Sequence, residues 1–212
     1  MTLRRFVVFL IAALLPCGAA FAQATPEADA DEDAWSFSAY GYAYLVGGDD
    51  DYFQPTVTAD HDGLHVEARH NYEDLDTSSL WGGYNFTAGE NVTFEGTAML
   101  GAVFGATSGI APGFKGTLSW SKLTLYGEAE YVFDLHESSD SFFYAWSEAS
   151  WAVNDWCRLG LVGQRTKVYQ TDREIQRGVL VGFASERVDF TTYVFNLDDR
   201  SPTVVVALGV NF

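Results

Sequence analysis

From Trp35 onward, apolar and polar residues alternate along the chain with a period of two. The clearest example is the segment 123–135, in which the odd positions are apolar or small and the even positions include Glu128, Glu130 and Asp134. Successive side chains of a β-strand point to opposite faces of the sheet, so this pattern predicts strands with one apolar and one polar face. No helical period persists over a useful window, and we therefore expect an all-β fold.

The alternating segments are separated by short stretches rich in Gly, Asn, Asp, Ser and Pro, which are typical of turns. Their boundaries predict twelve strands, at residues 35–46, 53–60, 63–73, 79–88, 91–104, 109–121, 122–135, 140–154, 155–170, 173–186, 187–199 and 202–212. Two of these predictions rest on weaker patterns, because Pro55 interrupts the second segment and the alternation of 187–199 slips between Tyr193 and Leu197. Ten strands is the alternative.

A soluble β-sandwich also alternates, so the alternation alone does not distinguish a sandwich from a membrane barrel. Several predicted strands exceed ten residues, which is long enough to cross a hydrocarbon layer when tilted. Their apolar faces are rich in Gly and Ala, which would pack a sandwich core poorly but can face lipid. Aromatic residues lie near the strand ends and predict two interfacial girdles, one with Trp35, Phe37, Phe86, Phe94, Trp120 and Trp151, the other with Phe53, Tyr72, Phe104, Phe133 and Phe143.

The last segment places Val204, Val206, Leu208, Val210 and the terminal Phe212 on one face. This pattern closely resembles the closing strand of Gram-negative outer-membrane β-barrel proteins. The resemblance is at the level of the class and points to no family of known activity. It implies a transmembrane up-and-down antiparallel β-barrel over residues 35–212, with these five residues as the signal read by the barrel-insertion machinery.

The start of the chain has the features of a secretory signal peptide over residues 1–22. Arg4 and Arg5 precede an apolar stretch of about ten residues, which is too short for a spanning helix, and Ala20-Phe21-Ala22 resembles a cleavage site. Pro16 before Cys17 argues against lipidation, and Cys157 alone then remains, so we expect no intramolecular disulfide. Residues 23–34 are acidic and lack large apolar side chains, which predicts a disordered tail.

The connections between predicted strands alternate between short turns and longer, acidic loops. In bacterial barrels the short turns are periplasmic and the longer loops are outside, so we expect an outer-membrane location with both termini in the periplasm. The acidic loops are expected to lie near outer-membrane lipid and lipopolysaccharide as solvated loop tips; the alternative is that divalent cations bind them and bridge lipopolysaccharide. The formal charge of −17 excludes a nucleic-acid binder with a general basic surface.

The polar face of the strands supplies the candidate functional residues. Eleven inward-facing residues are predicted to line the lumen: Tyr42, His65, Glu67, Arg69, Glu95, Lys115, Tyr126, Glu128, Glu130, Glu148 and Arg158. The five glutamates exceed the three basic residues in this set. Such charges require either pairing across the lumen or water.

Two functions fit this interior. One is a narrow, porin-like passive channel for small solutes, with a mild preference for cations. The alternative is a structural or interaction barrel with a closed, salt-bridged lumen. An enzyme is less favoured, because no G-x-S-x-G, H-E-x-x-H or paired-cysteine motif is present, and no serine near His70, the lipid-facing histidine, forms a recognisable motif with it. We therefore expect no catalytic residues, no metal site and no cofactor.

Overall fold

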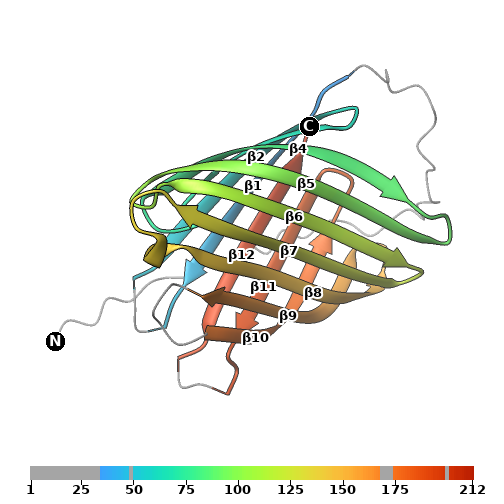
Figure 1. Ribbon diagram of the computed structural model, residues 1–212. Helices are drawn as coiled ribbons and strands as arrows, with labels where there is room; N and C mark the ends of the chain where they lie inside the picture. Colours follow the sequence, from blue (N-terminus) through green and yellow to red (C-terminus); the bar gives the residue numbers. More distant parts are fainter. Residues whose placement is uncertain (1–33, 48–49, 168–173, 199–200) are drawn as a thin grey trace. The chain divides into compact units, whose positions relative to one another are not determined.

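The described part of the chain is a closed barrel of twelve antiparallel strands, in which each strand pairs with its neighbours in sequence (Figure 1). The computed structural model describes residues 34–47, 50–167, 174–198 and 201–212. The strands are β1 (Ser36–Leu45), β2 (Tyr52–His61), β3 (Leu64–His70), β4 (Thr77–Ala88), β5 (Val92–Gly105), β6 (Gly109–Trp120), β7 (Leu123–Asp134), β8 (Phe142–Asn154), β9 (Cys157–Lys167), β10 (Glu174–Ala184), β11 (Val188–Phe195) and β12 (Thr203–Asn211). This confirms the predicted all-β, up-and-down barrel and the choice of twelve strands over ten.

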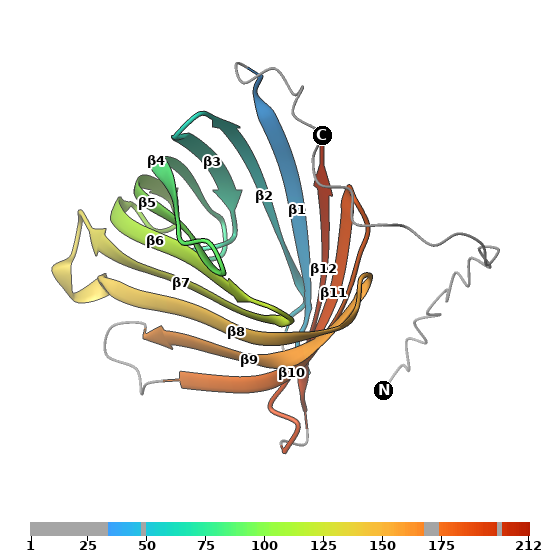
Figure 2. The same cartoon turned by 90° about the vertical axis from the view of Figure 1, so that its right-hand side faces the viewer.

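The first and last strands close the barrel. β1 and β12 pair antiparallel over Ser38 to Leu45, with Gly41 opposite Leu208, and they lie side by side in Figure 2. No sheet edge is therefore left open in the described barrel, as a β-structure in lipid requires. The predicted signal peptide (1–22) and nearly all of the predicted tail (23–34) lie outside the described residues.

Two strands end earlier than predicted. β3 stops at His70, and residues 71–76 form a loop in which Asn71 and Asp76 adopt positive φ angles of 56° and 55°. β11 stops at Phe195, and Asn196 also has a positive φ of 54°. Asparagine and aspartate tolerate this left-handed conformation better than most residues, which explains why the strands end there.

Pro55 does not interrupt β2, which pairs with β1 through it, opposite Gly41. The slipped alternation in 187–199 results from aromatic residues at inward positions of β11. Tyr193 and Phe195 are fully inward and buried, so the inner face of β11 carries large aromatic rings where a polar lumen residue was expected.

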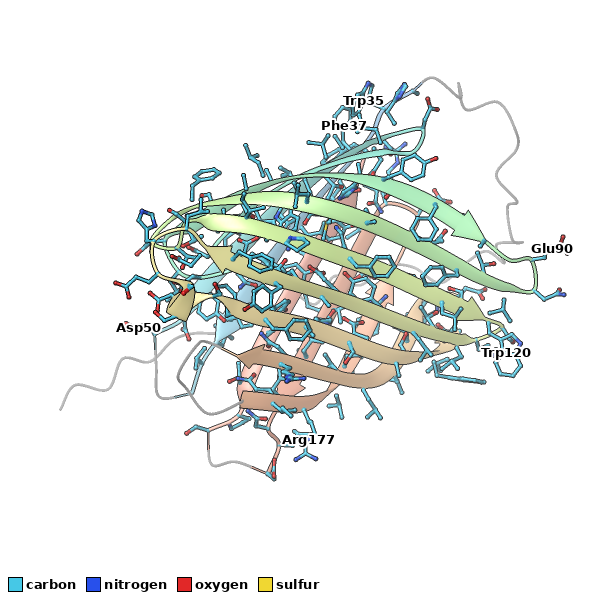
Figure 3. All side chains as sticks on the ribbon, in the orientation of Figure 1. Trp35, Phe37, Asp50, Glu90, Trp120 and Arg177 are labelled. Carbon is cyan, nitrogen blue, oxygen red and sulfur yellow. The ribbon has the colours of Figure 1, made fainter. Side chains whose placement is uncertain are left out.

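The outer face of the barrel is apolar. Large exposed hydrophobic side chains occur on every strand, as they would on a surface covered by lipid. Among the predicted girdle residues, Trp35, Phe37, Trp120 and Trp151 are exposed at the end with short turns, and Phe53, Phe104 and Phe133 at the other. Figure 3 shows Glu90 and Trp120 at the turn end and Asp50 at the opposite end.

Tyr72 was wrongly assigned to the girdle. It belongs to the loop between β3 and β4, and its hydroxyl donates a hydrogen bond of 2.7 Å to Glu128 inside the barrel. The residue lies beyond the end of β3, so the alternation of that strand does not determine the direction of its side chain.

The described residues contain almost no helix. A single turn, Ser138–Asp140, lies between β7 and β8. In the part of the chain that the structure describes, no helix is long and apolar enough to cross a membrane.

Two groups of large side chains fill much of the lumen. The first contains Trp146, Leu180, Tyr193, Phe195 and Val205, with Tyr44 and Tyr144. The second contains Trp81, Met99, Val103, Ala111, Val132 and Phe142. Trp81 fits because Gly101 and Gly113 leave space beside it: a Cβ on these glycines would lie 2.5 Å and 2.8 Å from the indole ring.

This packing predicts that valine is costly at Gly101 and tolerated at Gly82 on the neighbouring strand. Gly101→Val should destabilise the barrel by about 1–3 kcal/mol, because the new side chain displaces Trp81. Gly82→Val adds the same side chain where a Cβ meets nothing within 4 Å, and should change stability by less than about 0.5 kcal/mol. Urea unfolding in lipid vesicles, followed by tryptophan fluorescence, measures both. Equal effects of the two substitutions would contradict the proposed packing of Trp81.

Candidate functional site

The eleven predicted lumen residues lie on the inner side of their strands. Eight of them line one cavity of about 580 Å³: Tyr42, His65, Glu67, Glu95, Lys115, Tyr126, Glu128 and Glu148. The other three are elsewhere in the lumen. Arg69 and Glu130 are buried beside the cavity, and Arg158 forms a half-exposed ion pair of 3.3 Å with Asp189.

Arg69 is the centre of the buried charges. Its side chain is 1% exposed, and its guanidinium contacts Glu67 at 2.5 Å, Glu130 at 2.9 Å and Glu128 at 3.2 Å. Glu128 and Glu130 belong to β7, so one β3 side chain reaches across part of the lumen to a strand four positions away in the barrel. Buried carboxylates are stable only when paired and hydrogen-bonded, and Arg69 provides that pairing for three of them.

Aromatic rings complete the surroundings of this guanidinium. Its Cζ lies 4.2 Å from the ring centroid of Tyr72 and 4.6 Å from that of Trp81. A cation above the faces of two rings is attracted by their quadrupoles, especially when water is excluded. Arg69 is therefore held by carboxylates at its edge and by aromatic rings at its faces.

The charge network continues toward the short-turn end. Lys115 donates a hydrogen bond to Glu67. His65 has a carboxylate at each ring nitrogen, Asp60 at 2.6 Å and Glu67 at 3.0 Å. An imidazole donates to both only in its protonated form, so this arrangement favours a charged His65.

The loop between β3 and β4 adds a further carboxylate. Glu73 folds back into the barrel, where it accepts hydrogen bonds from Ser79 at 2.5 Å and from the indole of Trp81 at 3.3 Å. It lies 3.9 Å from Arg69. Burial raises the pKa of Glu73 above its ordinary value, although Arg69 and the hydrogen bonds act in the opposite direction.

We call this cavity of about 580 Å³ the vestibule. It is lined by the eight residues above and by residues at the short-turn end of the barrel. Ser38, Asp60, Asn85, Thr87 and Thr117 extend its wall to that end of the barrel. In the other direction it reaches Tyr44, Tyr72 and Tyr144. Tyr44 stacks on Tyr52 with centroids 4.5 Å apart, and Tyr72 packs edge-on to Tyr144 at 5.4 Å.

These four tyrosines form an aromatic layer at the loop end of the vestibule. Tyr44 and Tyr144 are buried, at 5% and 6% exposure, and belong to the packed cluster that fills this half of the lumen. The described lumen is thus wide at the short-turn end and closed by side chains toward the loops.

Several lumen acids were not among the predicted site residues. Asp60 and Asp189 continue the inward alternation of β2 and β11, so the pattern itself contained the signal for them. Glu73 lies in a loop without a period, so the sequence contained no signal for its direction. Among the described residues, no group of three or more His, Cys, Asp or Glu side chains is placed to hold a metal ion.

His70 has a serine partner that the sequence pattern did not reveal. Ser78 on β4 lies opposite His70 on β3, and its Oγ is 2.9 Å from Nδ1 of the histidine. The pair is on the exposed outer face near the loop end. In the described structure no carboxylate or amide orients the second ring nitrogen, which a nucleophile–base–acid arrangement requires.

Of the comparisons with known proteins, the one with solved structures found matches, and these concern the fold. No family model and no curated protein matches the sequence. Among solved structures, the KdgM porin covers 82% of this chain and 99% of its own at 11% identity, with a TM-score of 0.56, and its complex with disordered oligogalacturonate gives 0.58. The outer membrane protein Omp33 of Acinetobacter baumannii is 9% identical over 84% of this chain and 98% of its own, with a TM-score of 0.48. This chain therefore shares the barrel fold of the KdgM porin.

The Arg69 network predicts a large loss of stability when the guanidinium is removed. Arg69→Met should destabilise the barrel by about 3–5 kcal/mol, because it leaves several buried carboxylates without a cation. Arg158→Met is the control, since that half-exposed pair should contribute less than about 1 kcal/mol. The free energy of unfolding in lipid vesicles compares them. A loss of stability for Arg69→Met no greater than that for Arg158→Met would contradict the central role of Arg69.

Proposed function

We propose that this protein is a porin-like barrel of a Gram-negative outer membrane that provides a narrow, cation-preferring path for small solutes. The observation that carries the proposal is the vestibule of about 580 Å³, which enters the lumen from the short-turn end. The porin fold and the apolar outer face support the membrane location.

The charges of the vestibule wall favour cations. Five carboxylates line it, at Asp60, Glu67, Glu95, Glu128 and Glu148. The positive charges are those of Lys115 and His65 and of Arg69, which is buried beside the cavity. A cavity with walls of low dielectric and an excess of one charge concentrates ions of the opposite sign. Rings of acidic side chains are the usual basis of cation preference in channels.

The solute class should therefore differ from that of the structural neighbour. The KdgM porin was solved in complex with oligogalacturonate, a chain of sugar acids and hence a polyanion. The acidic vestibule of this barrel would repel a polyanion. The shared fold thus supports a passage through the lumen but not the same solute.

The aromatic layer favours a second candidate, a structural barrel without conduction. Tyr44, Tyr72 and Tyr144 close the loop half of the described lumen by direct packing. In the channel proposal these side chains must rotate for an ion to pass. The two candidates therefore differ in whether this layer opens.

The proposal includes an orientation and partners. The signal peptide at 1–22 would direct export, and the outward residues Val204, Val206, Leu208, Val210 and Phe212 would be read by the barrel-insertion machinery. The short turns and both chain termini would then face the periplasm, and the acidic loops would lie near lipopolysaccharide. No catalytic role is proposed, since His70 and Ser78 have no third orienting group in the described structure.

The aromatic layer provides the test of conduction. In planar bilayers we expect small conductance events with a reversal potential that indicates cation preference. Tyr144→Ala should raise the conductance at least severalfold, because it removes an inward ring from the layer. Phe143→Ala is the matched control, since its side chain points outward from the next position of β8.

Absence of conductance in both the unmodified protein and Tyr144→Ala would overturn the channel proposal and leave the structural barrel. Conductance with anion preference would contradict the electrostatic argument while leaving a channel.

A further inference from the structure

Three neighbouring inward positions on β7 and β8 form pairs of the same kind. Across the two strands Tyr126 lies opposite Glu148, Glu128 opposite Trp146, and Glu130 opposite Tyr144. Each pair combines one carboxylate with one aromatic ring: the carboxylate is on β8 in the first pair and on β7 in the other two. Cross-strand partners have their Cβ atoms about 5 Å apart, so each carboxylate lies beside a ring.

Two of these three carboxylates already bind a cation. Glu130 and Glu128 contact the guanidinium of Arg69, which also stacks on Tyr72 and Trp81. The barrel thus contains an internal example of a cation held between carboxylates and aromatic faces. Arg69 lies at the end of the series that is farthest from the short turns.

Glu148, at the vestibule end of the series, has a different set of partners. Its Oε1 accepts hydrogen bonds from the indole of Trp146 at 2.8 Å and from the hydroxyl of Tyr193 at 2.9 Å. Both donors are neutral, and no cationic side chain contacts Glu148 within the described residues. The carboxylate is therefore held in a fixed position with its negative charge unpaired.

The surroundings of Glu148 provide further contacts for a ligand. Tyr42 and Tyr126 line the vestibule and pack against the same aromatic cluster as Trp146. The volume of about 580 Å³ is in the range of small-molecule sites.

From this arrangement we infer that the vestibule binds a small organic cation, with its charge at Glu148 and its apolar part against Tyr42, Tyr126 and Trp146. An alkylammonium group satisfies the unpaired carboxylate and gains from the faces of the rings. The site deepens the proposed function, because it names the solute class of the channel, and only its transport role rests on that proposal.

The test is equilibrium binding of choline to the purified full-length barrel in a maltoside detergent, which carries no charge. Saturation-transfer NMR of the choline methyl signal gives the affinity, which we expect to be on the order of 1 mM. The uncharged isostere 3,3-dimethyl-1-butanol should bind at least tenfold more weakly. This comparison uses the unmodified protein and does not depend on the folding of any variant.

Three variants locate the site. Glu148→Gln should weaken choline binding about tenfold, because it removes the charge and keeps the shape. Trp146→Phe should weaken it about threefold, since it keeps an aromatic ring but loses the N–H that holds Glu148. Glu90→Gln makes the same charge change in an exposed turn outside the vestibule lining, and should leave the affinity unchanged.

The outcomes separate this inference from the proposed channel. Equal binding of choline and its uncharged isostere, or unchanged affinity in Glu148→Gln, would overturn the cation site. Choline binding without conductance would support the site and overturn the channel. Conductance without choline binding would support the channel and overturn the site.

Discussion

The interior of the barrel depends on one buried guanidinium. Arg69 contacts Glu67 on its own strand and Glu128 and Glu130 on β7, so it links two walls of the lumen through charge-assisted hydrogen bonds. Without it, the carboxylates would face each other in a space from which most water is excluded. The positions of Tyr72 and Trp81 follow from the same group, because both rings pack on its faces.

The distribution of apolar residues follows from the absence of a conventional core. Hydrophobic residues make up 48% of the sequence, a fraction typical of globular domains with a single core. In this fold many large apolar side chains are on the outside, where lipid would take the place of a core. The lumen in turn contains both buried charges and two clusters of large side chains. Glycine makes the packing of large side chains in the lumen possible, because Gly101 and Gly113 leave the space that the Trp81 ring occupies.

Much of the fold could be predicted from the sequence, because strand alternation is a local property. It identified all twelve strands and the inward direction of Glu67, Arg69 and Glu128. It could not predict Tyr72 or Glu73, since loop residues have no period, nor the pairing of His70 with Ser78, which depends on the register of β3 and β4. The closure of the loop half of the lumen could not be predicted from the sequence either, because it depends on how rings from distant strands pack against each other across the lumen.

The lumen has two parts. The half near the loops is closed by packed side chains, and the vestibule near the short turns contains the excess of acidic residues. At the depth of Arg69 the carboxylates are paired, and aromatic rings exclude water around the charges. Nearer the short turns the lumen widens, and Glu148 accepts hydrogen bonds only from neutral groups. A negative charge beside water can remain unpaired, whereas one at the depth of Glu130 cannot. The unpaired charge is therefore found where the lumen is open to solvent, in the vestibule that a dissolved cation can enter from the short-turn end.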